Sequence, residues 1–364
     1  MAVILAARRS AVAPRGGAFS AVRIEELGAP VLRAALADAG LAPEAVDELI
    51  VANALGAGGN PARRVALAAG LPETVAGLSI DRQCVGGLDA ILVARALVDS
   101  GAARVVVAGG VESYSRRPLR AMPGPSGPLP YDQAPFTPWP DRDPEMGAAA
   151  AALADRLAIG AQAQAAWAVG SHAKARAMVD WPEIVPINGV ARDAFTRALT
   201  AAIAARAPRL TGTITAATAA VAADAAAFVI VAADDLARPD SLAILGGTTL
   251  GGDPVEPGLA PVAAIAKALK ALNFSPDHLA MAEIMEAYAV QAIACVEGAG
   301  LDPSIVNTGG GALARGHPIG ASGAILAVRL FHSLPSGLGL AAIAAAGGLG
   351  TALVLSRQPR ESSA

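Results

Sequence analysis

Cys84 and His317 are the two residues of this chain whose surroundings favour covalent chemistry. Cys84 lies in the segment 81–90 and His317 in the segment 316–323, and glycines follow both of them closely. Glycines beside a reactive side chain let a substrate or a second backbone segment approach it. A thiol nucleophile with an imidazole base is the simplest reactive pair that these residue types can form. We therefore predict that both side chains line one cleft.

Cys84 comes just before residues 87–100, which have the apolar periodicity of a helix. The unpaired amides at a helix start carry partial positive charge, which favours the thiolate and would make Cys84 nucleophilic near neutral pH. The alternative is a small thiol that only fills the core. That alternative suits the other cysteine, Cys295, because it lies within an apolar helical pattern.

His317 could also cap the following helix or satisfy a buried carbonyl, but neither role explains the glycines around it, so we favour a functional histidine. The sequence contains no Cys-x-x-Cys pair, no His-Glu-x-x-His and no phosphate loop ending in Gly-Lys-Ser or Gly-Lys-Thr. The glycine run 309–311 leads to His317 and not into a dinucleotide-binding helix. No metal site and no resident cofactor are therefore predicted.

The composition narrows the class of protein. At 364 residues, with 54% hydrophobic and 16% charged residues, the chain can bury a large core in two or three lobes. A formal net charge of −3 gives no broad attraction to nucleic acid or to anionic membranes. The two cysteines are too few for a disulfide framework, the N-terminus lacks the order of a signal peptide, and the apolar stretches are shorter than a membrane helix. We expect a cytoplasmic protein.

Strand-like runs alternate with helical patterns along the first part of the chain. The runs 48–53 and 104–108 follow the helical patterns 27–41 and 87–100, respectively. This is the order of βαβ units, so we expect an α/β fold with a mostly parallel sheet covered by helices.

The C-terminal third repeats this alternation. Four elements are expected there: helices over 277–298 and 321–334, and strands over 340–346 and 351–356. The segments that contain Cys84 and His317 each place a reactive residue before a helix of small residues. An internal duplication is the economical explanation.

A proline-rich segment, residues 116–144, should form an extended surface loop, and residues 146–209 are alanine-rich and helical in pattern. These segments separate the two similar parts of the chain. The predicted organisation is an N-terminal half, residues 1–115 completed by 216–240, an inserted substrate lobe, residues 116–215, and a C-terminal half, residues 241–364.

Several segments, in order along nearly the whole chain, resemble the thiolase family. Residues 307–323 are similar to the family's histidine signature, and residues 83–88 to its nucleophile loop, with glycine at position 86 where a serine is common. Residues 60–63, 109–115 and 286–289 also fall in the family's order.

The resemblance implies two similar βαβαβαββ halves in a five-layer arrangement with an inserted loop lobe, assembled as a homodimer or homotetramer. It also implies an acyl-CoA substrate and no further cofactor. Cys84 would take the acyl group, and His317 would activate the thiol and help to hold the thioester oxygen. We place four further residues at the substrate: Met146, Ala287, Tyr288 and Ala346.

Three positions depart from the family's pattern. Ala344 stands where thiolases usually carry a second catalytic cysteine, which removes the proton in condensation. Met285 stands where an asparagine is expected, and a thioether cannot orient a water for an oxyanion hole. Ala220 stands where a pantetheine-contacting serine is expected. We expect condensation to be weakened and coenzyme A binding to be less secure than acylation of Cys84.

Three functions remain open on the sequence. The favoured one is a thiolase-like acyltransferase that forms an acyl-cysteine from an acyl-CoA, with weakened or altered condensation chemistry. The second is a condensing enzyme that uses a malonyl-type donor, because decarboxylation makes the carbanion without a base. The third is a non-catalytic subunit that keeps the fold for assembly.

Overall fold

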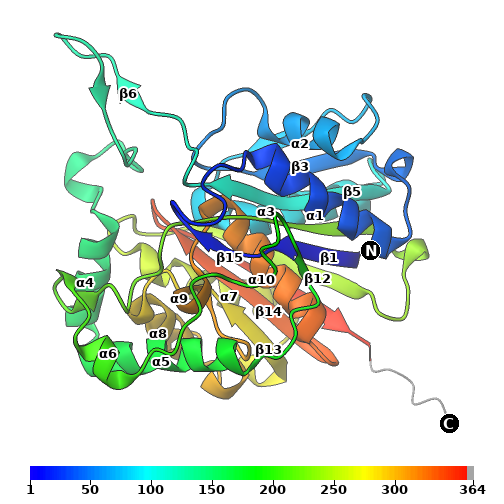
Figure 1. The fold of residues 1–364 in the computed structure, drawn as a ribbon. Helices are drawn as coiled ribbons and strands as arrows, with labels where there is room; N and C mark the ends of the chain where they lie inside the picture. The colour runs from blue at the N-terminus through cyan, green and yellow to red at the C-terminus, as the bar shows by residue number, and fades with distance from the viewer. Residues whose placement is uncertain (359–364) are drawn as a thin grey trace.

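A computed structural model describes residues 1–358, and the last six residues of the predicted C-terminal half, 359–364, lie outside the described part. Within it, the main strands form one extended sheet made of two halves, joined where β1 pairs with β12 (Figure 1). The strands of the first half, in chain order, are β1 (Ala2–Ser10), β3 (Glu48–Ala52), β4 (Leu78–Ile80), β5 (Val105–Ser113) and β11 (Ala223–Ala233). They lie in the order β4-β3-β5-β11-β1.

The second half of the sheet repeats this arrangement. Its strands, in chain order, are β12 (Leu242–Gly251), β13 (Leu279–Ile284), β14 (Gly337–Ala345) and β15 (Leu349–Arg357). Their order, β13-β14-β15-β12, is that of β3-β5-β11-β1 in the first half. In the second half, a parallel bridge between Ala282 of β13 and Val306 corresponds to the pairing of β3 with β4 in the first half. The duplication inferred from the two reactive segments is therefore visible in the strand order.

Helices form three layers around and between the two halves of the sheet (Figure 1). One outer layer has α1 (Ile24–Ala39) and α2 (Pro61–Ala69), and the other has α7 (Ala260–Ala271) and α8 (Ala289–Gly298). The central layer has α3 (Gly86–Asp99) and α10 (Ile319–Ser333). Side chains of these two helices and of both halves of the sheet make the central hydrophobic core. The predicted five-layer, thiolase-like α/β fold is confirmed. The prediction of a mostly parallel sheet is wrong, because only the pairings β3–β4, β3–β5 and β13–β14 are parallel, and the other five along the strand order are antiparallel.

The two central helices pack closely enough that their backbones touch. A Cβ atom added to Gly87 would lie 2.5 Å from the backbone nitrogen of Ala324, so only glycine fits this position. Cys84 lies just before α3 and His317 just before α10. The close packing of the helices therefore sets how near these two residues come to each other.

Between β5 and β11 the chain forms two hairpins and three α-helices. The first hairpin, of β6 (Ala121–Met122) and β7 (Leu129–Pro130), projects from the body of the molecule (Figure 1). The helices α4 (Met146–Arg156), α5 (Ala161–Ala177) and α6 (Ala201–Ala205) follow, and then the second hairpin, of β9 (Arg209–Thr211) and β10 (Ile214–Thr215). Residues 178–200 contain no helix, contrary to the alanine-rich pattern, because the chain there makes the short strand β8 (Ile184–Val185) alongside β1. The predicted lobe limits stay a prediction.

The prediction of one helix over residues 277–298 is wrong. Strand β13 occupies the first part, a turn follows at 285–288, and α8 begins only at Ala289. Because β13 is buried on both faces, it lacks the alternation of a half-exposed strand and looks like part of a buried helix. Among residues 1–358, no helix is long and apolar enough to cross a lipid bilayer.

Candidate active site

Cys84 lies on a sharp turn between β4 and α3. The preceding residue, Gln83, has a φ of 51°, a left-handed conformation that is uncommon for residues other than glycine. The carboxylate of Asp81 supports the turn, because it accepts the backbone N–H of Gln83 at 2.9 Å. Such backbone strain persists only where the surrounding structure imposes it, and it is frequent at active sites.

His317 lies on the corresponding turn before α10. Its backbone N–H donates to the carbonyl of Val221 at 2.7 Å, and its Nδ1 lies 2.7 Å from the hydroxyl oxygen of Ser322. The other ring nitrogen, Nε2, lies 3.2 Å from Sγ of Cys84. With Ser322 bonded to Nδ1, Nε2 is the ring nitrogen that can accept a proton from the thiol.

Burial favours the neutral form of both groups. It raises the pKa of the Cys84 thiol to about 12, with smaller contributions from the negative charges of Glu112 and Asp81. It lowers the pKa of His317 to about 4. The expectation that Cys84 is a thiolate near neutral pH is therefore wrong, because the loss of hydration outweighs the helix amides. The sulfur needs the adjacent imidazole to take its proton.

A buried carboxylate, Glu112 in β5, joins the loop after β3 to the first turn of α10. It accepts the side-chain amide of Asn53 at 2.8 Å and the backbone N–H groups of Ala54 at 2.9 Å and Gly320 at 3.0 Å. Burial raises the pKa of Glu112 to about 7. Sequence reasoning missed this residue, although a carboxylate inside an apolar strand was a usable signal.

A cavity of about 490 Å³ contains both Cys84 and His317. It is also lined by every predicted substrate residue, namely Met146, Ala287, Tyr288 and Ala346. Ala344 and Ala220 line it too. Met285 does not, because it is only 1% exposed and packs in the central core. The roles assigned to these residues from the sequence stay predictions, but their positions fit one substrate cavity.

Charged side chains of both signs line the cavity, which sequence reasoning did not foresee. We call Arg15, Arg117 and Arg120, with Asp132 paired to Arg117, the arginine end. We call Glu145 and Glu256 the glutamate end. These residues come from loops far apart in the sequence, so only the fold reveals that they share a cavity.

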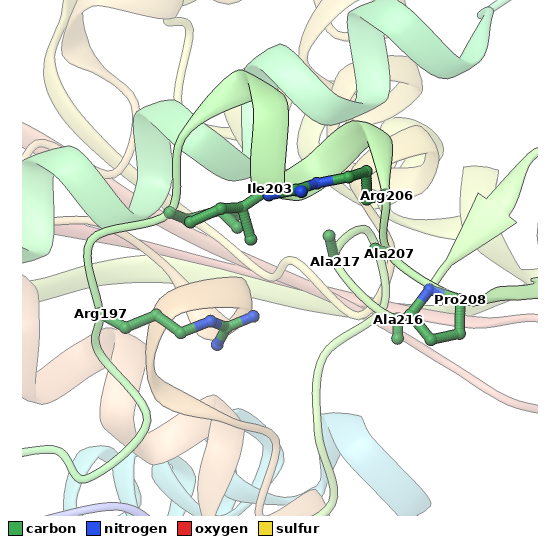
Figure 2. Close-up of a pocket in the computed structure, with 8 residues that line it drawn as sticks. Arg197, Ile203, Arg206, Ala207, Pro208, Ala216 and Ala217 are labelled. Carbon is green, nitrogen blue, oxygen red and sulfur yellow. The ribbon is translucent and has the colours of Figure 1, made fainter.

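A second pocket, of about 340 Å³, lies in the inserted region (Figure 2). Its charged residues are Arg197 and Arg206, and within the described residues neither forms an ion pair. The segment 216–222 links the two pockets, since its first residues line this pocket and its last residues line the larger cavity. Two unpaired guanidinium groups at a pocket suit a phosphate ligand.

The five-layer duplicated fold, with a thiol and an imidazole at the starts of its central helices, defines the class of thiolase-like acyltransferases. Models of two families match the chain: Thiolase, N-terminal domain, over residues 2–235, and Thiolase, C-terminal domain, over residues 241–357. The chain belongs to the thiolase family.

Individual relatives agree. The acetyl-CoA acetyltransferase of Cupriavidus necator is 36% identical, over 98% of this chain and 99% of the relative, and that of Thiocystis violacea is 34% identical, over 98% of both. The crystal structure of the Bacillus anthracis acetyl-CoA acetyltransferase superposes with a TM-score of 0.90 at 33% identity, over 98% of both chains. The Acat5 thiolase from Ascaris suum in complex with coenzyme A gives 0.91 at 29%, over 98% and 99%. The prediction of an acyltransferase is confirmed.

Proposed function

We propose that this protein transfers an acyl group from an acyl-CoA to Cys84, and that its condensation chemistry is weak. The observation that carries this proposal is the 3.2 Å contact between Sγ of Cys84 and Nε2 of His317 inside the 490 Å³ cavity. Cys295 offers no alternative nucleophile, because it is buried in an outer core.

The acylation step follows from this contact. His317 Nε2 takes the thiol proton while Sγ of Cys84 attacks the thioester carbonyl. The bond between the carbonyl carbon and the sulfur of coenzyme A then breaks, and the imidazolium returns its proton to the departing thiolate. Because both groups are neutral near pH 7, we expect proton transfer to accompany the attack and not to precede it.

Coenzyme A would lie along the segment 216–222. Its uncharged pantetheine arm would pass Met146 and Tyr288 at the glutamate end of the cavity, and its phosphates would reach the pocket of Arg197 and Arg206 (Figure 2). The support for this path is electrostatic. The unpaired guanidinium groups favour phosphate, whereas the carboxylates of the glutamate end would repel phosphate but not the uncharged arm.

Condensation would need a second base to remove a proton from the attacking carbon. Ala344 lines the cavity at the position that resembles the family's second cysteine, and its methyl group cannot accept a proton. Loss of one catalytic base commonly lowers a rate by roughly 10² to 10⁴. We therefore infer that acyl transfer survives without efficient carbon–carbon bond formation.

The deciding experiment is to incubate the protein with acetyl-CoA and measure its intact mass. The proposal predicts an added acetyl group that peptide mapping places on Cys84. If no acyl-CoA gives an adduct, a non-catalytic subunit becomes the better explanation. If malonyl-CoA releases carbon dioxide, and Cys84→Ala abolishes the release, a decarboxylative condensing enzyme is favoured. The expected homodimer or homotetramer stays a prediction for sedimentation to test.

A further inference from the structure

We propose that the arginine end of the cavity binds a carboxylate at the far end of the acyl chain. The preferred donors would then be dicarboxylic acyl thioesters, such as succinyl-CoA or glutaryl-CoA, and not plain fatty acyl thioesters. This inference rests on the proposed acylation of Cys84 and specifies the substrate class of that same site.

Arg15 is close to the catalytic histidine along the sheet. Its backbone N–H donates to the carbonyl of Ala222 at 2.8 Å, and Ala222 forms a parallel bridge with His317. The backbones of Arg15 and His317 are therefore about two strand spacings apart, or roughly 10 Å. The Arg15 side chain lines the same cavity as His317, within reach of a short acyl chain bound to Cys84.

Tyr114 connects the arginine end electrostatically with the thiol. The guanidinium carbons of Arg117 and Arg15 lie 5.0 and 5.9 Å from the centre of its ring. Burial raises the pKa of Tyr114, the two arginines lower it, and a negative charge on Cys84 would raise it further. The phenol therefore lies within electrostatic range of both the nucleophile and the two guanidinium groups.

The guanidinium groups of this end are not fully neutralised by the protein. Within the described residues, Arg15 forms no ion pair. Arg117 pairs with Asp132, but the arginine side chain is 11% exposed whereas the aspartate is 84% exposed and well hydrated. The other nearby carboxylate, Asp224, accepts the backbone N–H of Ser115 at 2.9 Å, and burial raises its pKa more than the charge of Arg15 lowers it. Arg15 is exposed whereas Arg117 is sheltered, and two adjacent, incompletely neutralised guanidinium groups favour an anionic group of the substrate.

The negative charge of the glutamate end would orient the acyl chain in the cavity. The charge of Glu145 contributes to the raised pKa of Tyr288, whose main cause is burial, and the same carboxylate accepts the N–H of Ala148 at 2.8 Å. Glu256 pairs with Arg156 at 2.6 Å. An acyl carboxylate would be repelled from this end, so the acyl chain is directed toward the arginines.

The experiment compares donors of matched chain length, one charged and one neutral. Glutaryl-CoA and pentanoyl-CoA are each mixed with the wild-type protein, and the rate of Cys84 acylation is followed by intact mass. We expect glutaryl-CoA to react faster by about tenfold or more, since a hydrogen bond to a charged partner contributes roughly that factor. In Arg15→Gln the ratio of the two rates should fall toward one. Arg104→Gln, which removes a surface arginine paired with Asp235, should leave the ratio unchanged.

The outcomes separate this inference from the proposed acylation. If Cys84 is acylated equally fast by both donors, the arginine end does not select a carboxylate and this inference fails alone. If no donor gives an adduct, the proposed acylation fails as well. If Arg15→Gln slows both donors by the same factor, the guanidinium contacts the phosphates common to both, which also overturns the inference. Arg117→Lys, which keeps the charge of the more buried arginine, should retain most of the preference, and thermal unfolding midpoints would identify any misfolded variant.

Discussion

The residue that directly follows the corresponding strand is polar in the N-terminal half, after β3, and apolar in the C-terminal half, after β13. Asn53, which directly follows β3, donates to Glu112 of β5 at 2.8 Å. In the second half, β13 is followed by the buried Met285, and β14 ends next to the cavity with Ala344 and Ala345. The two halves share one topology, so the difference lies in the side chains alone.

This contrast corresponds to the two steps of the proposed reaction, acylation and condensation. In the proposed function, acylation uses the thiol and the imidazole at the starts of α3 and α10, and the carboxylate of Glu112 joins the loop after β3 to the first turn of α10 by accepting the N–H groups of Ala54 and Gly320. Under the proposed function, condensation would need a further base in the cavity wall of the second half, where β14 ends in Ala344 and Ala345. The duplicated fold would then support acylation without efficient condensation.

The largest expected effect is that of Cys84→Ala. We expect it to lower acyl adduct formation by about 10⁴-fold or more, since removal of a nucleophile leaves only residual catalysis. Intact mass after incubation with acetyl-CoA measures the change. The matched control is Cys295→Ala, which truncates the buried cysteine of the outer core and should still be acylated. An adduct that persists in Cys84→Ala would show that the acyl group is attached to a residue other than Cys84.

The next largest expected effect is a gain of activity when a thiol is added at the end of β14, in the C-terminal half. Ala344→Cys adds a thiol to the wall of the cavity, and we expect thiolysis of acetoacetyl-CoA to rise by roughly 10² to 10⁴, the usual contribution of one acid or base. The loss of acetoacetyl-CoA absorbance measures this rate. Ala344→Ser is the control of similar size, because its hydroxyl is a much weaker acid and should give little gain. No gain in a variant whose Cys84 is still acylated would show that more than the base is missing.

The third prediction concerns the pH dependence of acylation, which depends on the thiol and the imidazole. His317 accepts the thiol proton only when neutral, and its pKa is lowered to about 4, while that of Cys84 is raised to about 12. Acylation should therefore change by no more than about twofold between pH 6 and 9 and decline as the pH falls toward 4. A free thiol of pKa about 8.5 would instead react about tenfold faster for each unit by which the pH rises, until the pH reaches that pKa. Quenched intact-mass time courses distinguish the two profiles.

The sequence was sufficient to place Cys84 and His317 in one cavity and to infer the duplicated fold. Cys84 and His317 are each followed by small residues that permit the close packing of α3 and α10, and this pattern is local. The contact of Asn53 with Glu112 joins residues 59 positions apart, so it depends on strand order and register, which no local pattern contains. The arginine end was missed for the same reason.

The electrostatics of the site were also beyond the sequence. A helix start predicts a lowered thiol pKa, whereas burial, which depends on how the whole chain packs, raises it. The strand β13 was mistaken for part of a helix because its residues are buried on both faces and lack a period of two. Local patterns therefore found the central helices but failed for a strand buried on both faces, and properties set by packing could not be found from them.

The smallest expected effect of a substitution is that of Ser322→Ala. The hydroxyl of Ser322 lies 2.7 Å from Nδ1 of His317 and the residue is 3% exposed, so the variant removes one buried hydrogen bond and keeps the Cβ atom. Such a bond contributes about 1 kcal/mol, and without it Nε2 would carry the proton part of the time. We expect the acylation rate at saturating acetyl-CoA to fall by about fivefold with an unchanged half-saturating concentration, because the serine orients the base and does not bind the substrate. Ser333→Ala, at the last residue of the same helix, is the control. A weaker apparent affinity with an unchanged maximal rate would instead assign Ser322 to substrate binding and leave His317 oriented by its backbone alone.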